Sequence, residues 1–256
     1  AGAGVGMHRR RLDDALECGG DIDRLRRRIM RPSTLYRREF RRLVLAEQPR
    51  SLLEVGSGNG ELLREMLAAG VRAEGIEADA QKVAAMRDQQ LPVQVGRAED
   101  LPYADGAFDV VVSEYCAHHF ADLARHLAEA ARVASKAVLV LDPWYDESID
   151  TQRTAAAFDR WFKAIDRAGG MVHHDVLDAE HFRAAMPANA GLSFECRHLL
   201  QLVPVDFGFF DAESAPYLDR ATATEKAELA AIRATMAARG MTDDGAILVL
   251  LRRPPG

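Results

Sequence analysis

The pattern of apolar and polar positions changes at residue 51. Before it, residues 9–47 have helical spacing, with breaks at Gly19-Gly20 and at Pro32-Ser33, and we predict two or three helices, the last over 33–47. After it, short apolar runs alternate with amphipathic stretches. These predict strands and helices in turn: strands at 51–55, 73–76, 93–95, 108–113 and 137–141, and helices at 61–69, 80–90 and 120–134.

Strand and helix in alternation indicate a parallel sheet with helices on both faces. Strands of such a sheet are buried on both sides, so they appear as continuous apolar runs, as at 110–112 and 138–141. After residue 141 the alternation loosens. Here we predict helices and strands as follows: helices at 151–167, 179–185 and 224–239, and strands at 193–203 and 246–251. The expected fold is α/β, with a doubly wound, mostly parallel seven-stranded sheet and late helices that form a lid.

The composition places the chain among globular proteins. Its 256 residues are 48% hydrophobic and 28% charged, which excludes disorder or coiled coil for the whole chain. No apolar run reaches the roughly 18–20 residues of a bilayer span, so we expect no membrane association. Three scattered cysteines, Cys18, Cys116 and Cys196, fit a reducing cytoplasm. Residues 1–6 are an Ala/Gly string that we interpret as an addition ahead of Met7, and we expect no signal peptide.

Charge is distributed unevenly along the chain. Residues 1–50 hold 13 arginines against 7 acidic residues, a balance of +6, whereas the remainder carries −12. Nucleic-acid-binding proteins concentrate positive charge on their working surface, so the acidic body argues against a nucleic-acid partner. Two interpretations of the basic start stay open. It forms helices that dock on the acidic body, or it is a basic lid that attracts an anionic substrate.

A glycine-rich turn follows the first predicted strand. It reads Glu-Val-Gly-Ser-Gly-Asn-Gly-Glu at 54–61. Glycines between a strand and a helix let a ligand approach the backbone closely. The spacing is Gly-x-Gly-x-Gly, which differs from the Gly-x-Gly-x-x-Gly of dinucleotide-binding folds. The second strand then ends at Glu77, and a carboxylate at that tip can accept both hydroxyls of a ribose.

A third segment completes a family resemblance. It reads Gly-Arg-Ala-Glu-Asp-Leu-Pro-Tyr at 96–103 and precedes the run Phe-Asp-Val-Val-Val-Ser at 108–113. With the glycine turn and Glu77, these runs resemble the class I S-adenosylmethionine-dependent methyltransferases, in particular the small-molecule enzymes of ubiquinone and menaquinone biosynthesis. The resemblance covers residues 51–142, and 113–122 is similar to the family's segment after the fourth strand.

Two positions depart from the family's pattern. The family commonly has an acid where Arg97 stands, so the contact to adenine would rest on Glu99, Asp100 or backbone amides. Residues 133–136 lack the family's Pro-Gly-Gly, which implies a tighter turn.

The resemblance implies a Rossmann-like methyltransferase fold that binds S-adenosyl-L-methionine. Glu54 would orient the amino-acid end of the cofactor, Glu77 would hold the ribose hydroxyls and Glu99 the adenine. The full implied cofactor set is Glu54, Gly56, Ser57, Gly58, Gly60, Glu77, Ala78, Ala98, Glu99, Asp100 and Glu114. We expect a single domain over 1–256, with an N-terminal helical lid at 7–50, a cofactor-binding half at 51–142 and a substrate-side half at 143–256.

Methyl transfer depends on alignment, and a base is required only for an acceptor that carries a proton. His118 and His119 are the candidate bases, because they follow the fourth strand at the edge where ligands bind in open α/β sheets. The alternative is that one histidine packs while the other faces water. The residues expected at the substrate are Tyr36, Trp144, Tyr145, His173 and His174.

We expect no metal site. His173 and His174 with Glu114, Asp142 or His118 would be suitable ligands, but neighbouring histidines usually point in different directions. The predicted function is methyl transfer to O, N or C of a small molecule, anionic or aromatic, in specialised metabolism in the cytoplasm. Two alternatives remain: a methyltransferase that acts on a peptide or other macromolecule, and a scaffold that binds S-adenosylmethionine without catalysis.

Overall fold

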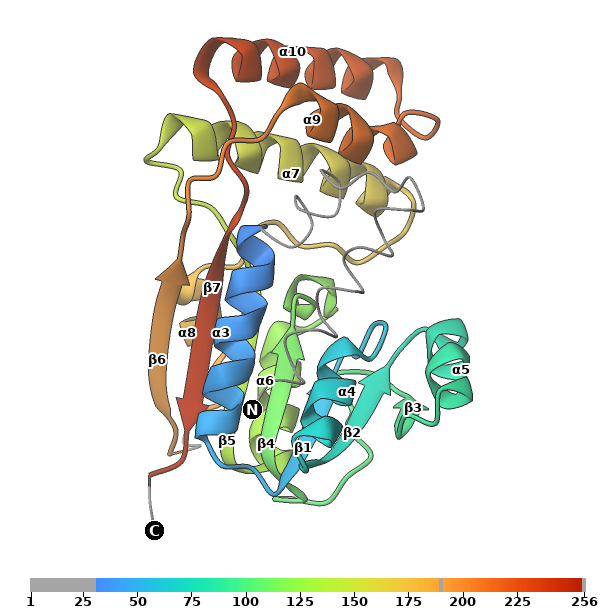
Figure 1. Ribbon diagram of the computed structural model, residues 1–256, viewed down its shortest axis with the longest axis vertical. Helices are drawn as coiled ribbons and strands as arrows, with labels where there is room; N and C mark the ends of the chain where they lie inside the picture. Colours follow the sequence, from blue (N-terminus) through green and yellow to red (C-terminus); the bar gives the residue numbers. More distant parts are fainter. Residues whose placement is uncertain (1–30, 189–190, 255–256) are drawn as a thin grey trace, which may run out of the picture.

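Seven strands form the centre of the molecule (Figure 1). The computed structural model describes residues 31–188 and 191–254. The strands are β1 (Ser51–Val55), β2 (Arg72–Glu77), β3 (Val93–Val95), β4 (Phe108–Glu114), β5 (Ala134–Trp144), β6 (Ser193–Leu199) and β7 (Gly245–Arg252). They pair in the order β3-β2-β1-β4-β5-β7-β6, and of these strands β7 alone runs antiparallel to its neighbours. The predicted mostly parallel sheet is confirmed.

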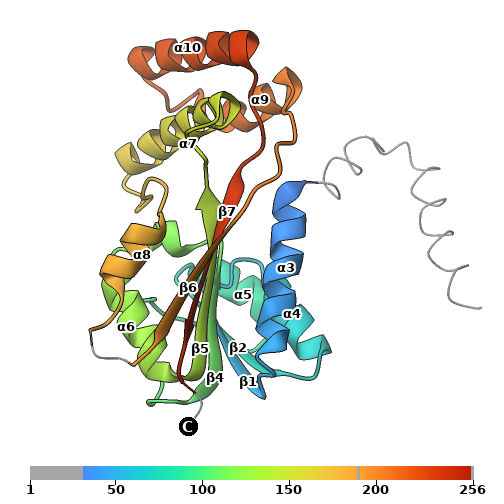
Figure 2. The same cartoon turned by 90° about the vertical axis from the view of Figure 1, so that its left-hand side faces the viewer.

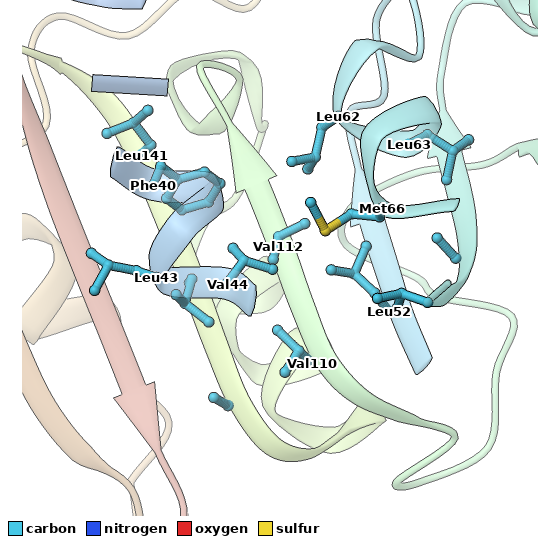
Figure 3. Packing of buried hydrophobic residues seen from close by; sticks show 14 of the residues in the cluster. Phe40, Leu43, Val44, Leu52, Leu62, Leu63, Met66, Val110, Val112 and Leu141 are labelled. Atoms are coloured by element: carbon cyan, nitrogen blue, oxygen red, sulfur yellow. The ribbon is translucent and has the colours of Figure 1, made fainter. Parts of the chain in front are cut away.

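Helices cover both faces of this sheet (Figure 2). One face carries α3 (Pro32–Ala46), α4 (Glu61–Ala68) and α5 (Ala80–Asp88), and the other carries α6 (Leu123–Val133) and α8 (Ala179–Ala185). Val110 and Val112 of β4 face the first group, where Phe40 and Val44 of α3 pack with them (Figure 3). Val111 faces the second group. Burial on both sides therefore explains the continuous apolar runs.

Three further helices form a layer beyond the carboxyl ends of the parallel strands (Figures 1 and 2). They are α7 (Asp150–Ala168), α9 (Phe207–Ser214) and α10 (Ala223–Arg239), and we call them the cap. The cap has its own apolar core, which includes Phe158, Trp161, Phe210 and Ile232. Of the late helices predicted to form a lid, α7 and α10 belong to the cap, whereas α8 packs on the sheet. Short 3₁₀ turns, η1 (Ala117–His119) and η2 (Ala215–Tyr217), complete the described elements.

The structure differs from the predictions in one strand boundary and in one additional helix. The strand predicted at 193–203 ends at Leu199, because its pairing with β7 stops where Leu199 lies opposite Ala246. Helix α9 was not predicted, although Asp206 caps it by accepting a hydrogen bond from Phe209 N at 2.8 Å. Its aromatic sequence has little amphipathic pattern.

Part of the predicted N-terminal region lies outside the described residues. This applies to residues 1–30, with the helices and Cys18 predicted there. Helix α3, the described part of that region, packs against the sheet. Within the described part of the chain, every helix is too short or too polar to cross a lipid bilayer.

Candidate functional site

The turn between β1 and α4 is a left-handed glycine loop. Gly56, Gly58 and Gly60 have φ angles of +78°, +54° and +72°, which side chains rarely adopt. A Cβ at Gly56 would lie 2.6 Å from Cys116 Sγ, so a side chain cannot be accommodated there. A Cβ at Gly58 would have no atom of the described chain within 4 Å, apart from its neighbours in sequence. The loop is thus tightly packed at its start and open at its middle.

Glu77, at the end of β2, holds this loop. Its Oε2 accepts a hydrogen bond from Gly58 N at 2.8 Å, and its Oε1 accepts one from Asp79 N at 3.0 Å. Gly56 N donates to the Ile76 carbonyl at 2.8 Å, which ties the loop to β2. Because each carboxylate oxygen can accept more than one hydrogen bond, Glu77 is positioned with acceptor capacity left for a ligand.

Glu54 lies buried in β1 beneath the loop. Burial, and then the negative charge of Glu114, raises the pKa of its carboxyl well above the usual range. Its Oε2 accepts no hydrogen bond from any residue that the structure describes. The Ser57 hydroxyl donates to the Glu54 carbonyl at 3.3 Å. A buried carboxyl oxygen without a partner at this position is suited to a ligand that brings a donor.

Glu114, at the end of β4, is engaged by helix α3. Arg41 donates to both of its carboxylate oxygens, from Nε at 3.0 Å and from Nη2 at 2.9 Å, and Arg37 donates to it as well. Its carboxylate therefore anchors α3. This arrangement matches the interpretation of basic helices that dock on an acidic body, as far as α3 is concerned.

A cavity of about 500 Å³ opens between the glycine loop, the end of β2 and the turn after β4. Small-molecule sites typically have volumes of this order. We call it the loop cavity. Predicted site residues that line it are Gly56, Gly58, Glu77, Ala78, Ala98, Glu99 and His119. Predicted residues outside its lining are Glu54, Ser57, Gly60, Asp100, Glu114 and His118. Lining residues that we did not predict include Tyr115, Cys116, Phe120, Met171 and Val172.

Glu99 connects one wall of the loop cavity to the start of α6. Its Oε1 accepts a hydrogen bond from Ala121 N at 2.7 Å, and its Oε2 lies 3.4 Å from Arg97 Nη2. Arg97, the departure from the family's pattern, is thus an ion-pair partner of Glu99. Asp100 N donates to the Arg97 carbonyl at 3.3 Å, so Asp100 shapes the turn.

Tyr115 is the unpredicted residue with the most unusual geometry. Its φ of +55° lies in the left-handed region, which is strained for a tyrosine. Its hydroxyl is buried and finds no hydrogen-bond partner among the described residues, and burial raises its pKa. Such strain is commonly found at functional sites.

Three histidines meet beside the loop cavity. The ring centres of His118 and His119 are 4.3 Å apart, those of His119 and His173 4.3 Å, and those of His118 and His173 5.2 Å. One ring nitrogen of each lies within 4.8 Å of the others. We call these residues the histidine cluster. Turn η1 brings the rings of His118 and His119 together, with His118 buried and His119 exposed. The neighbouring His173 and His174 diverge as expected, because His173 joins the cluster while His174 Nε2 lies 2.8 Å from the Phe120 carbonyl.

Each histidine of the cluster is oriented through its Nδ1. That of His118 is 2.8 Å from Asp142 Oδ1, that of His173 is 3.1 Å from Asp166 Oδ2, and that of His119 is 2.9 Å from the Val172 carbonyl. Burial lowers the pKa of His119, and burial with the neighbouring histidines lowers that of His173 to about 4. These two imidazoles are therefore neutral at pH 7.

Of the remaining predicted substrate residues, Tyr36, Trp144 and His174 do not line the loop cavity. His174 packs the turn, because its Nε2 is 2.8 Å from the Phe120 carbonyl. The Tyr36 hydroxyl accepts a hydrogen bond from Gln201 N at 2.6 Å within the core. Trp144 stacks on His198, with ring centres 4.0 Å apart. Tyr145 lines a second cavity between the end of β5 and the cap.

We call this second space the cap cavity. Its walls combine aromatic rings, among them Phe158 and Phe162, with carboxylates that come from several elements: Asp159, Glu213, Asp243 and Asp244. Burial, followed by the charges of Asp243 and Asp159, raises the pKa of Asp244 to about 7. The ring of Phe162 also lies 6.0 Å from that of His173. The histidine cluster therefore borders the loop cavity through His119 and the cap cavity through Phe162.

The part of the chain that carries the glycine loop and Glu77 is similar to known proteins. Residues 53–141 match the model of a methyltransferase domain. Ajmaline N-methyltransferase from Rauvolfia serpentina is 33% identical over 104 residues, which is 37% of this chain and 36% of that protein. Demethylmenaquinone methyltransferase from Deinococcus radiodurans is 30% identical over 106 residues, 38% of this chain and 44% of that protein.

The chain thus spans little more than a third of the length of the first of these curated relatives. Similarity to solved structures is more extensive. The YcgJ protein of Bacillus subtilis superimposes with a TM-score of 0.56 at 18% identity, over 80% of this chain and 92% of that one. At this identity the likeness shows a shared fold.

Proposed function

We propose that this chain, whose residues 53–141 match the model of a methyltransferase domain, is a class I S-adenosylmethionine-dependent methyltransferase that transfers a methyl group to a small molecule. One observation carries the proposal. The loop cavity is bounded by a left-handed glycine loop and by Glu77, whose carboxylate is fixed by Gly58 N and Asp79 N. A preorganised carboxylate beside open backbone is the arrangement that receives a ribose.

The residues of the loop cavity fit S-adenosylmethionine. Glu77 would accept hydrogen bonds from the ribose hydroxyls, and the open space at Gly58 would admit the sugar. The unpartnered Oε2 of Glu54 would receive the ammonium group of the amino-acid end, directly or through water. Ala98 and Glu99 would border the adenine. When bound, the cofactor supplies an electrophilic methyl group whose transfer neutralises the charge on sulfur.

The chain's own residues would align the acceptor and manage its proton. Alignment of reacting groups can contribute on the order of 7–11 kcal/mol. His119 is the candidate base that lines the loop cavity. Because the Val172 carbonyl can only accept a hydrogen bond, His119 Nδ1 must carry the proton in this contact. Its Nε2 therefore keeps a lone pair. A lowered pKa keeps this imidazole neutral and able to take the proton of a hydroxyl or an ammonium.

The cap cavity indicates the class of acceptor. Its aromatic rings suit an apolar or ring-shaped body, and its four carboxylates suit hydroxyl or amine groups that donate hydrogen bonds. Arg31 also lines this cavity, with its Nη2 3.8 Å from Glu213 Oε1, and the four carboxylates outnumber this one cation, which disfavours an anionic acceptor. An aromatic small molecule with donor groups is thus preferred over an anion, and ajmaline N-methyltransferase among the relatives is consistent with a basic nitrogen as one such group.

Isothermal titration calorimetry with S-adenosylhomocysteine tests the cofactor site. We expect binding by the native chain and a loss of about tenfold or more in Glu77→Ala, because each charge-assisted hydrogen bond to the ribose contributes roughly 1.5–3 kcal/mol. Asp88→Asn is the matched control, an exposed acid on the neighbouring α5. Equal affinities for the native chain and Glu77→Ala would refute the assignment. Transfer of labelled methyl to a panel of small molecules then separates an enzyme from a binding scaffold.

A further inference from the structure

We propose that the histidine cluster, His118, His119 and His173, is a binding site for one divalent transition-metal ion of the zinc class. The three residues come from two separate segments, η1 and the loop after α7, and their rings meet at 4.3–5.2 Å between centres. Imidazole is a preferred ligand for zinc and its neighbours in the transition series. Three protein ligands leave a coordination position open, as in catalytic zinc sites.

The hydrogen bonds behind the cluster are those of a metal site. Histidine ligands almost always donate their second ring nitrogen to a carboxylate or a backbone carbonyl, which fixes the tautomer. All three histidines follow this rule, with Nδ1 directed at Asp142, Asp166 and the Val172 carbonyl. The nitrogens left to bind are the three Nε2 atoms, each with a lone pair. Lone pairs that gather in one place repel one another unless a cation lies between them.

The surrounding charges favour a cation. Asp142 is fully buried; its Oδ1 lies 2.8 Å from His118 Nδ1, and its Oδ2 has no hydrogen-bond partner in the described chain. Asp166 contributes a second negative charge, and its Oδ1 forms an ion pair with Arg220 Nη2 at 3.0 Å. The nearby Lys163 is neutralised by Asp159, whose Oδ2 lies 2.9 Å from its Nζ. A divalent ion would therefore meet a net negative environment.

The distances allow ligation with small movements. Tetrahedral coordination with metal–nitrogen bonds of about 2.0–2.1 Å requires ligand nitrogens roughly 3.4 Å apart. One nitrogen of each ring already lies within 4.8 Å of the others, so side-chain movements of about 1 Å would bring three ligand nitrogens to this spacing. His119 is accessible, and its Nε2 can approach without repacking of the core.

The role of the ion rests on the proposed function. An acceptor hydroxyl that occupies the open position would have its pKa lowered by the ion. Its lone pair forms the bond to the methyl carbon, the carbon–sulfur pair goes to sulfur, and the acceptor's proton is released to water. This assigns His118 and His119 as ligands in place of bases, and it puts the acceptor between the loop cavity and the cap cavity.

Titration of the metal-free protein, prepared without a histidine tag, with Co²⁺ tests the site directly. We expect visible absorption bands of a nitrogen-ligated ion that saturate at one equivalent per chain and disappear when Zn²⁺ is added. Asp166→Asn should weaken binding about 10–100-fold, because the partner of a ligand histidine sets its orientation. His119→Ala should weaken it further.

His181→Ala is the matched control, because His181 is an exposed histidine outside the cluster. It should bind Co²⁺ as the native chain does. Circular dichroism of each variant checks that the fold is retained. Because His119 is exposed, His119→Ala should disturb the fold less than substitution of the buried His118 or His173. Failure of the native chain to bind Co²⁺ or Zn²⁺ stoichiometrically, or equal binding by His119→Ala, would overturn the proposal.

The same samples separate this inference from the proposed function. Calorimetry with S-adenosylhomocysteine reports on the loop cavity whether or not Co²⁺ binds. Cofactor binding without Co²⁺ binding would overturn the metal site alone. Co²⁺ binding without cofactor binding would overturn the methyltransferase assignment and leave the metal site standing.

Discussion

A buried histidine links the stability of this protein to pH. His126 of α6 is fully buried, with Nδ1 3.3 Å from the Ala98 carbonyl and Nε2 3.2 Å from Ser113 Oγ. Because the carbonyl accepts, Nδ1 donates and Nε2 accepts from the serine, so the neutral ring is fully satisfied. Burial lowers its pKa from 6.5 to about 4.

The free energy of unfolding should therefore fall as the pH drops through this window. Between pH 6.5 and 4 the unfolded chain binds a proton at His126 that the folded chain excludes. We expect His126 to contribute about 2 kcal/mol to the loss between pH 7 and pH 5. Urea denaturation at pH 7 and at pH 5 measures the loss of free energy of unfolding. This loss should be smaller in His126→Gln, whereas the exposed control His181→Gln should lose as much as the native chain. An unchanged pH dependence in His126→Gln would contradict this account.

The glycine loop and Glu77 could be predicted from the sequence, whereas the side of the loop cavity formed by the loop after α7 could not. Gly56, Gly58 and Glu77 lie close together in sequence within a strand–turn–helix–strand pattern, so their meeting could be inferred. Met171 and Val172 reach the loop cavity from a loop more than 90 residues away from Glu77, and local pattern carries no signal for that contact. The convergence of His173 on His118 depends on the same loop.

At the scale of elements, helix α3 is fixed by a buried ion pair. Arg41 is 9% exposed and binds Glu114 of β4, and it also contacts Glu61 and Glu65 of α4. Removing one partner of a buried pair leaves the other charge uncompensated, which typically costs about 3–5 kcal/mol. Arg37 remains as a second partner of Glu114, so the lower part of this range applies.

Arg41→Met should thus lower the free energy of unfolding by about 3 kcal/mol. Arg42→Met is the control on the same helix, because Arg42 makes an exposed pair with Glu39, and pairs of this kind contribute at most about 1 kcal/mol. Urea denaturation compares the two. Similar losses for Arg41→Met and Arg42→Met would show that the pair does not anchor α3.

Elements with a regular apolar pattern were the ones that the sequence predicts well. Strands β1 and β4 are buried at every position and appear as short, largely apolar runs between helices. Edge strand β6 is partly exposed, and apolar residues continue beyond its end at Leu200, Leu202 and Val203, so the pattern does not mark where the strand stops. Helix α9 contains Gly208 among aromatic residues. It is stabilised by packing of Phe210 in the cap core, which local sequence does not reveal.

At the scale of the whole molecule, the sheet and the cap form two binding spaces with the histidine cluster between them. The loop cavity lies at the carboxyl ends of β1, β2 and β4, where open α/β sheets bind ligands. The cap cavity is lined by residues that follow β5 and by the late helices. The cofactor side could be predicted because its motif is local. The acceptor side could not, because its walls come from four distant segments.

A crystal structure with S-adenosylhomocysteine tests the central claim most directly. We expect its adenosyl group in the loop cavity, both ribose hydroxyls within hydrogen-bonding distance of the Glu77 carboxylate, and its sulfur directed toward His119. The account would be contradicted by a ligand bound elsewhere on the chain, or by one in this cavity with its ribose away from Glu77.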